Sequence, residues 1–119
     1  MEITENRRND IVIVSIHGRL DASNAGLLEQ KLLDLIARGD TRVVLDGAEL
    51  DYISSAGLRV LLVAKKRLPA GGAITLCALK DLIKEIFDIA GFSSIFTIYE
   101  TADEAIAAPR EGGKAKEER

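Results

Sequence analysis

The sequence predicts a single α/β domain whose sheet is mixed and mostly parallel. Short runs of β-branched and apolar residues, such as IVIVSIH at 11–17 and RVVLD at 42–46, are typical of buried strands. Between such runs lie longer segments in which apolar residues recur at helical spacing. Because this alternation places a helix between successive strands, most strands should run parallel. We expect about five strands and about four helices, folded as one domain over residues 1–108.

Four runs have the composition of strands and bound the predicted helices. They are 11–17, 42–46, 73–77 and 95–99. A weaker signal at 3–5 predicts a strand that pairs with the first of them through the polar loop at 6–10. The N-terminal part of the chain is therefore expected to form a hairpin.

Two helices follow from apolar spacing and from signals at their ends. In residues 25–38 the apolar positions are helically spaced, Ser23 or Asn24 can cap the start, and Gly39 can end the helix. Residues 55–68 are apolar nearly all round after the first turn, and three basic residues follow where the helix dipole favours cations. We expect this second helix to be the buried, central one.

Two further helices are expected in the last third of the chain. The first should end at Gly91 and bury one face. That face consists of Leu79, Leu82, Ile83, Ile86 and Ala90. The second begins at Thr101, whose spacing to Glu104 predicts a capping box, and Pro109 should stop it.

The composition of the chain argues against several functional classes. The chain has 119 residues and a net charge of -3, whereas a nucleic-acid-binding protein normally carries a basic excess. With one cysteine and one histidine, neither an internal disulfide nor a zinc site of the Cys/His type is possible, and we expect no metal or cofactor. No apolar run approaches the roughly 20 residues that span a bilayer, and the first residues lack the apolar region of a signal peptide. We therefore expect a cytoplasmic protein with no membrane partner.

The last eleven residues, PREGGKAKEER, differ from the rest of the chain. They carry seven charges and no large apolar side chain. Because such a segment cannot repay the entropy lost on ordering, we expect residues 109–119 to be a disordered tail.

The segment DYISSAGLR, residues 51–59, lies where an α/β domain commonly places its functional loops. Ser54 is well placed as the N-cap of the following helix, with Ile53 and Leu58 as a hydrophobic staple. Ser55 is then the first helical residue, and its hydroxyl should face solvent near the positive end of the helix dipole. That position tolerates a phosphate, so a phosphoserine is one interpretation. The other is that both serines only satisfy amides at the helix start.

Two segments of the chain resemble one known family. HGRLDASNA at 17–25, followed by VVLDGAELDYISSAGLRVLL at 43–62, resembles the anti-sigma factor antagonists, whose domain is called STAS. The resemblance covers residues 11–108. It implies a mixed sheet packed with helices, which agrees with the element order above.

The resemblance also implies a partner-switching function. A family member binds an anti-sigma factor that is also a serine kinase, is phosphorylated by it, and is then released. The unphosphorylated antagonist frees the sigma factor, and a metal-dependent serine phosphatase regenerates it. Phosphorylation adds about -1.5 to -2 charge, which would disrupt an interface built around a neutral hydroxyl. We therefore expect a non-enzymatic transcription regulator that acts through protein–protein interaction with such a kinase and phosphatase.

Carried over to this sequence, the family motif assigns the site residues. The phosphoacceptor, two places before the Gly-Leu pair, is Ser55. Ser54, which stands where many members have Asp, is a minor alternative. Arg59 replaces a common Gly, and could pair with a phosphate, pair with a partner carboxylate, or be solvated. The expected partner-binding residues are Asp21, Ala22, Ser23, Asn24, Ile53, Ser54, Ala56, Gly57, Leu58 and Arg59.

Other functions leave weaker signals. His17 lies late in a strand, and no catalytic triad is visible. Asp46 ends a strand, as the phosphoacceptor of response-regulator receivers does, but their paired acidic residues are absent and a capping role is favoured. Cys77 lies in an apolar strand and is interpreted as a buried, unreactive thiol. The alternative that stays open is a STAS scaffold that is never phosphorylated, in a stress-signalling or lipid-transport complex.

Overall fold

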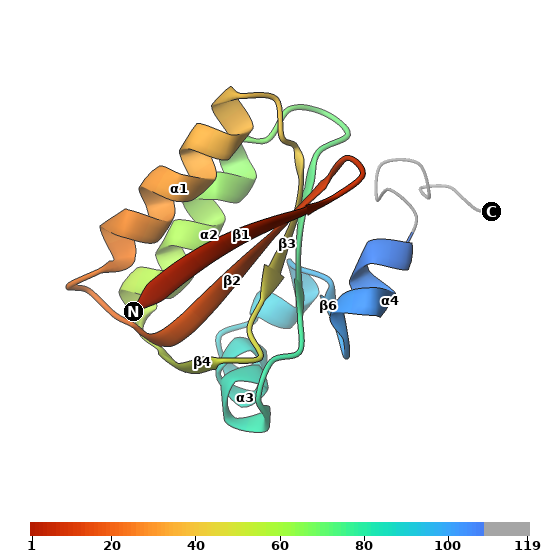
Figure 1. Ribbon diagram of the computed structural model, residues 1–119. Coiled ribbons are helices and arrows are strands. Elements are labelled where there is room, and N and C mark those ends of the chain that lie inside the picture. The colour runs from red at the N-terminus through yellow and green to blue at the C-terminus, as the bar shows by residue number, and fades with distance from the viewer. Residues whose placement is uncertain (109–119) are drawn as a thin grey trace.

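The computed structural model describes residues 1–108, which form a six-stranded sheet packed with helices (Figure 1). The strands are β1 (Glu2–Arg8), β2 (Ile11–Leu20), β3 (Arg42–Asp46), β4 (Leu50–Ile53), β5 (Ala73–Cys77) and β6 (Ile98–Tyr99). The helices are α1 (Ala25–Ala37), α2 (Ser55–Arg67), α3 (Asp81–Ile89) and α4 (Ala102–Ala107), with the 3-10 turn η1 (Phe92–Ser94). The predicted α/β class is confirmed. The stop predicted at Pro109 and the tail predicted at 109–119 lie outside the described residues.

The sheet combines one antiparallel pair with parallel neighbours, as predicted. β1 pairs antiparallel with β2, while β2, β3, β5 and β6 follow one another as parallel strands. The N-terminal hairpin is confirmed, but the loop predicted at 6–10 is wrong, because β1 extends to Arg8. Only Asn9 and Asp10 form the turn, and Asn9 adopts a positive φ of 58°. The signal was weak because β1 is an edge strand whose side chains are almost all exposed, so it shows no apolar alternation.

Two strand predictions need correction. β4, which pairs with the end of β2, is not predicted, because its four residues include a charged side chain and are too short to show a period. The strand predicted at 95–99 shrinks to β6. The preceding chain instead turns helically so that Phe92 and Phe96 are both buried, with ring centroids 5.9 Å apart. The Phe96 amide donates to the Phe92 carbonyl oxygen at 2.9 Å, which fixes that turn.

The buried face of α3 also differs from the prediction. Ile83 is buried as expected and Leu79 is buried just before the helix, but Leu82 is 65% exposed and Ala90 is exposed. Phe87, one turn after Ile83, is fully buried and defines the face that packs on the core. The helix therefore turns its larger aromatic side chain inward and leaves Leu82 in solvent.

Two apolar clusters cover the two faces of the sheet. Along β3, Val43 and Leu45 join the larger cluster, to which α1, α2 and α3 contribute, whereas Val44 joins a smaller cluster with Ala105 of α4. α1 and α2 lie side by side on the larger cluster (Figure 1). α2 is buried along one face and exposes its basic last turn. The prediction of a buried central helix is therefore correct for one side only.

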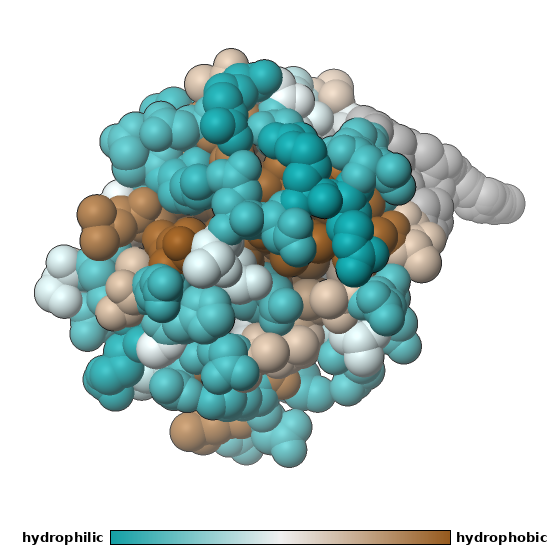
Figure 2. All heavy atoms as spheres, in the orientation of Figure 1, coloured by the Kyte–Doolittle hydropathy of each residue, from teal (hydrophilic) through white to brown (hydrophobic). Residues whose placement is uncertain are grey.

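Polar residues dominate the visible surface, and apolar residues emerge in small separate areas (Figure 2).

The capping box predicted for α4 is present, since the Glu104 amide donates to Thr101 Oγ1 at 3.1 Å. Among residues 1–108, no helix combines the length and the apolar character needed to cross a membrane.

Candidate functional site

Parallel pairing of β2 with β4 brings the two segments singled out in the sequence to one edge of the molecule. Leu20 lies opposite Ile53 in this pair, and the Ser54 amide donates to the Leu20 carbonyl oxygen at 2.9 Å. Because parallel strands end at the same edge, the turn that follows β2 and the helix start that follows β4 are neighbours. We call this edge the switch end; it comprises residues 19–24 and 52–59.

Ser54 caps α2, as the sequence predicts. Its backbone is extended, and its Oγ accepts a hydrogen bond from the Gly57 amide at 3.4 Å. Ile53 and Leu58, the two predicted staple residues, are both buried in the larger cluster. Packing is tight here, because a Cβ added to Gly57 would lie 2.9 Å from side-chain atoms of Ile53 and Leu20. The helix start is therefore held by both a cap and close packing.

Ser55 is the first residue of α2 and is exposed. Within residues 1–108, its hydroxyl makes no hydrogen bond to another group. The oxygen that caps the helix is that of Ser54. The first amides of a helix have no intrahelical acceptor, and the dipole there favours negative charge. The geometry thus presents an uncommitted hydroxyl at a position that can hold an anion.

The turn after β2 is fixed by side-chain hydrogen bonds to its own backbone. The Asp21 carboxylate accepts from the Ser23 amide at 3.0 Å and from the Ser23 hydroxyl at 2.6 Å. These bonds from Ser23, with a smaller contribution from the nearby charge of Arg19, lower the pKa of Asp21 below its usual value. Asn24 accepts from the Asp21 amide and donates to the Arg19 carbonyl oxygen, both at 2.9 Å.

These bonds correct the capping role predicted for Ser23 or Asn24. Asn24 occupies the N-cap position of α1, but its side chain does not bond the helix amides. It instead spans the turn back to β2. The result is a rigid turn in which Ala22 and Ser23 are exposed.

The predicted partner-binding residues divide into an accessible and a buried set. Ile53, Gly57 and Leu58 are buried, so they support the surface from below. Ala56 is half-buried and Arg59, one turn after Ser55 on the same side of α2, is exposed. These two residues, together with Ser54 and the turn residues, are the accessible part of the switch end.

Two residues at the switch end, Arg19 and Tyr52, are not predicted from the sequence. The Arg19 guanidinium carbon lies 4.2 Å from the centre of the Tyr52 ring, across the β2–β4 pair. The signal was present as an arginine in GRLD and a tyrosine in LDYI. Recognising it required knowledge of β4, because only that pairing makes the two residues neighbours.

The alternative chemical sites find structural roles. His17 Nε2 lies 3.5 Å from Thr4 Oγ1 across the β1–β2 pair. Asp46 Oδ1 accepts from the Ala48 amide at 3.0 Å, which stabilises the turn after β3. Cys77 is fully buried, and this burial, with a smaller effect of the Asp46 charge, raises its thiol pKa to about 12. Among the described residues, no group of three His, Cys, Asp or Glu side chains could hold a metal ion.

A family comparison decides what this arrangement belongs to. Residues 2–105 match the model of the STAS domain. The chain belongs to the STAS domain family. It is 43% identical over 109 residues to BtrV of Bordetella bronchiseptica, a candidate anti-sigma factor antagonist, covering 91% of this chain and 94% of BtrV. It is 35% identical over 92 residues to the anti-sigma-B factor antagonist of Bacillus subtilis, covering 76% of this chain and 82% of that protein.

Solved structures of STAS proteins share the fold. An anti-sigma factor antagonist from Mycobacterium paratuberculosis superposes with a TM-score of 0.85 at 23% identity, over 92% of this chain and 94% of that chain. The phosphorylated form of the Bacillus cell fate determinant SpoIIAA superposes with a TM-score of 0.69 at 20% identity, over 88% of this chain and 96% of that chain. At these identities the likeness concerns the fold, and it agrees with the mixed sheet described above.

Proposed function

We propose that this STAS protein is an anti-sigma factor antagonist that binds an anti-sigma factor serine kinase and is inactivated by phosphorylation on Ser55. The observation that carries the proposal is the division of labour between two adjacent serines. Ser54 supplies the cap of α2, and Ser55 keeps an exposed hydroxyl with no hydrogen bond within residues 1–108. The names of the relatives from Bordetella and Bacillus support the antagonist class.

The geometry of the switch end explains how one phosphate could release a partner. Ser55 shares the switch end with the fixed 21–24 turn and the exposed Arg59, so a partner that covers this end also covers the hydroxyl. A phosphate adds about -1.5 to -2 charge and three acceptor oxygens at that point. In a desolvated contact this addition costs affinity without any rearrangement of the antagonist.

In this proposal the chain is regulatory and performs no catalysis itself. The partner contacts come from Asp21, Ala22, Ser23, Asn24, Ser54, Ala56 and Arg59, supported from below by Ile53, Gly57 and Leu58. A metal-dependent serine phosphatase in the cytoplasm would remove the phosphate and restore binding. Ser54 remains the minor alternative acceptor.

The test combines phosphorylation with binding. The chain is incubated with ATP and a purified serine kinase of the histidine-kinase-like ATPase type from the same organism, and phosphopeptides are mapped by mass spectrometry. We expect one phosphatase-sensitive phosphate on Ser55, none on Ser55→Ala, and tight binding of Ser55→Ala to the kinase. Ser55→Asp should bind more weakly than the wild type.

Two controls give each outcome a meaning. Ser94→Ala changes an exposed serine outside the switch end and should leave phosphorylation and binding unaltered. Strong phosphorylation of Ser55→Ala on Ser54 would move the acceptor by one residue. Absence of phosphate on protein purified from its own host under every growth condition would contradict the switch and favour a constitutive STAS scaffold.

A further inference from the structure

The Arg19–Tyr52 pair is built by an irregularity in the sheet. Gly18 lies opposite Leu50, but Arg19 lies opposite Tyr52, so β4 contains one extra residue at this point. Gly18 has a φ of +94°, a conformation that glycine adopts readily. Bulges of this kind re-aim side chains and recur beside functional sites. Here the bulge places the guanidinium over the tyrosine ring at 4.2 Å.

This pair points away from the face that carries α1, α2 and α3. Leu20 and Ile53, the next residues on each strand, are buried in the larger cluster, and side chains alternate between faces along a strand. On the other face, the smaller cluster under α4 uses Ile11 and Ile13 at the start of β2. On this face the cover decreases towards the end of β2, because Ser15 and His17 are half-buried and Arg19 is exposed. The pair therefore lies on an open part of the sheet, at the sheet side of the switch end.

The Arg19 guanidinium is held in place but is not neutralised. Among residues 1–108, it makes no hydrogen bond or ion pair, unlike Arg7, Arg38 and Arg42, which all pair with carboxylates. Its charge reaches the turn, because it contributes to lowering the pKa of Asp21. Stacking on the half-buried Tyr52 restricts the side chain while its donors stay available.

We propose that Arg19, stacked on Tyr52, receives an acidic side chain of the anti-sigma kinase at the switch end. This inference rests on the function proposed above and extends its interface from the helix start onto the open sheet face. A stacked arginine has lost part of its freedom before binding, so pairing with a carboxylate costs less entropy. The planar guanidinium can donate two parallel hydrogen bonds to a carboxylate, a geometry that lysine cannot reproduce. Arginine and tyrosine are also the residue types enriched among interface hot spots.

The experiment measures binding of the kinase that phosphorylates Ser55, with all variants made in the Ser55→Ala background. This background removes the phosphate, so Arg19 cannot act by pairing with it. We expect Arg19→Glu to raise Kd by at least about tenfold, because it opposes two like charges in the contact. Arg19→Lys should raise Kd by about threefold, since the positive charge stays but the two parallel hydrogen bonds of the guanidinium are lost. The loss of affinity caused by Arg19→Glu should become smaller as the salt concentration is raised.

Matched variants separate the pair from general charge and from folding. Arg8→Glu makes the same charge change at an exposed arginine opposite Ile11, the far end of β2, and should leave Kd unchanged. Tyr52→Phe keeps the ring and should bind normally, whereas Tyr52→Leu removes the stack and should weaken binding by about threefold. Unfolding curves in urea confirm that each variant is folded.

The outcomes distinguish this inference from the function on which it rests. If the Ser55→Ala protein binds the kinase and Arg19→Glu binds equally well, the inference is wrong and the antagonist function stands. Equal weakening by Arg8→Glu and Arg19→Glu would also overturn it, because the effect would then be one of net charge. If the parent protein fails to bind any such kinase, the proposed function falls first and the inference falls with it.

Discussion

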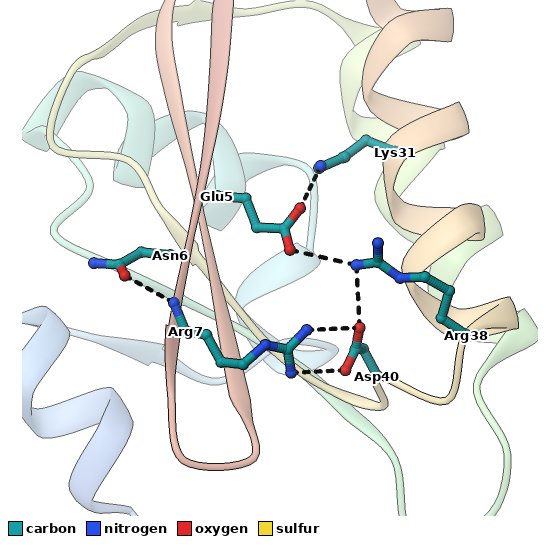
Figure 3. Close-up of polar contacts among 6 residues, drawn as sticks. All are labelled: Glu5, Asn6, Arg7, Lys31, Arg38 and Asp40. Atoms are coloured by element: carbon teal, nitrogen blue, oxygen red, sulfur yellow. Dashed lines mark hydrogen bonds and ion pairs between the residues drawn. The ribbon is translucent and has the colours of Figure 1, made fainter.

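The two ends of α1 use polar groups in opposite ways. At its start lies the switch end, where polar side chains bond the backbone and Ser55 is left over. From its middle to just beyond its last residue lies a set of five charged residues that we call the charged cluster (Figure 3). It consists of Glu5, Arg7, Lys31, Arg38 and Asp40.

In the charged cluster every charge has a partner on another segment. Arg7 donates two hydrogen bonds to the Asp40 carboxylate, at 2.9 and 3.0 Å, and so joins β1 to the residues after α1. Arg38 bridges Asp40 at 3.2 Å and Glu5 at 3.3 Å, and Lys31 also pairs with Glu5. The cluster thereby fastens the exposed edge strand β1 to the helix beside it (Figure 3).

The difference shows how to separate structural from functional polar groups on this surface. Where opposite charges on different segments pair with one another, as in the charged cluster, the ion pairs stabilise the fold and are not available to a binding partner. At the switch end the fold is held by packing and caps instead. Within residues 1–108 the Ser55 hydroxyl makes no hydrogen bond, and the Arg19 guanidinium, although it stacks on Tyr52, makes no hydrogen bond or ion pair. Stability should therefore respond strongly to packing changes at the switch end and weakly to charge changes in the cluster.

The largest effect should come from Gly57→Ala. A methyl group there would meet Ile53 and Leu20 side-chain atoms at 2.9 Å, and both residues are buried and cannot easily yield. We expect a loss of about 2 kcal/mol in the free energy of unfolding, measured in urea, because overpacking outweighs the better helix propensity of alanine. Gly26→Ala is the matched control on α1, where nothing lies within 4 Å, and it should be neutral or stabilising by about 0.5 kcal/mol. Equal effects at both glycines would contradict tight packing at the switch end.

The next effect should separate the two serines. Ser54→Ala removes the capping oxygen that accepts from the Gly57 amide, and should lower the free energy of unfolding by about 1 kcal/mol. Ser55→Ala removes an exposed hydroxyl without a hydrogen bond in the described structure, so its effect should stay within about 0.5 kcal/mol. Thermal or urea unfolding of both variants measures the difference. A larger loss for Ser55→Ala would mean that its hydroxyl belongs to the fold.

The sequence alone is sufficient to predict this division of the serines. Extended chain before Ser54 and apolar helical spacing after it place the cap at one residue, and local backbone geometry is what decides a cap. Arg19 and Tyr52 are different, because their contact depends on β4 and on a bulge that shifts the register by one residue. Four residues carry too little periodicity to reveal such a strand.

The same contrast explains the errors in the rest of the fold. Strands buried on both faces, such as β3 and β5, show their apolar composition and are predicted at their correct bounds. The end of β1 is missed because its edge residues, including those of the charged cluster, are polar on both faces. The strand expected at 95–99 is shorter than predicted, because burial of Phe92 and Phe96 overrides local β propensity before Ile98.

A smaller effect is expected in the charged cluster. Asp40→Asn removes the carboxylate that pairs with Arg7 and Arg38, yet exposed ion pairs contribute little, so the loss should be about 0.5 to 1 kcal/mol at low salt. The loss should decrease in 1 M NaCl, where the Debye length is about 3 Å. Asp34→Asn on α1 is the control, because the asparagine can still accept from Gln30. A salt-independent loss of several kcal/mol would show that the cluster holds the fold as firmly as the switch end does.

The smallest effect is the contribution of the charged cluster to the pH dependence of stability. The hydrogen bond from Lys31 lowers the pKa of Glu5, and the hydrogen bonds from Arg7 lower the pKa of Asp40. Burial offsets part of each shift. A carboxylate whose pKa is lower in the folded than in the unfolded state stabilises the fold above its unfolded pKa, and this contribution is lost as the pH falls through the folded value. The wild type should therefore be more stable than the Glu5→Gln, Asp40→Asn double variant at pH 7, and the gap should close between about pH 5 and pH 2. Urea unfolding across that range measures it, and a gap that does not change with pH would mean that shape and hydrogen bonding, rather than charge, hold β1 against α1.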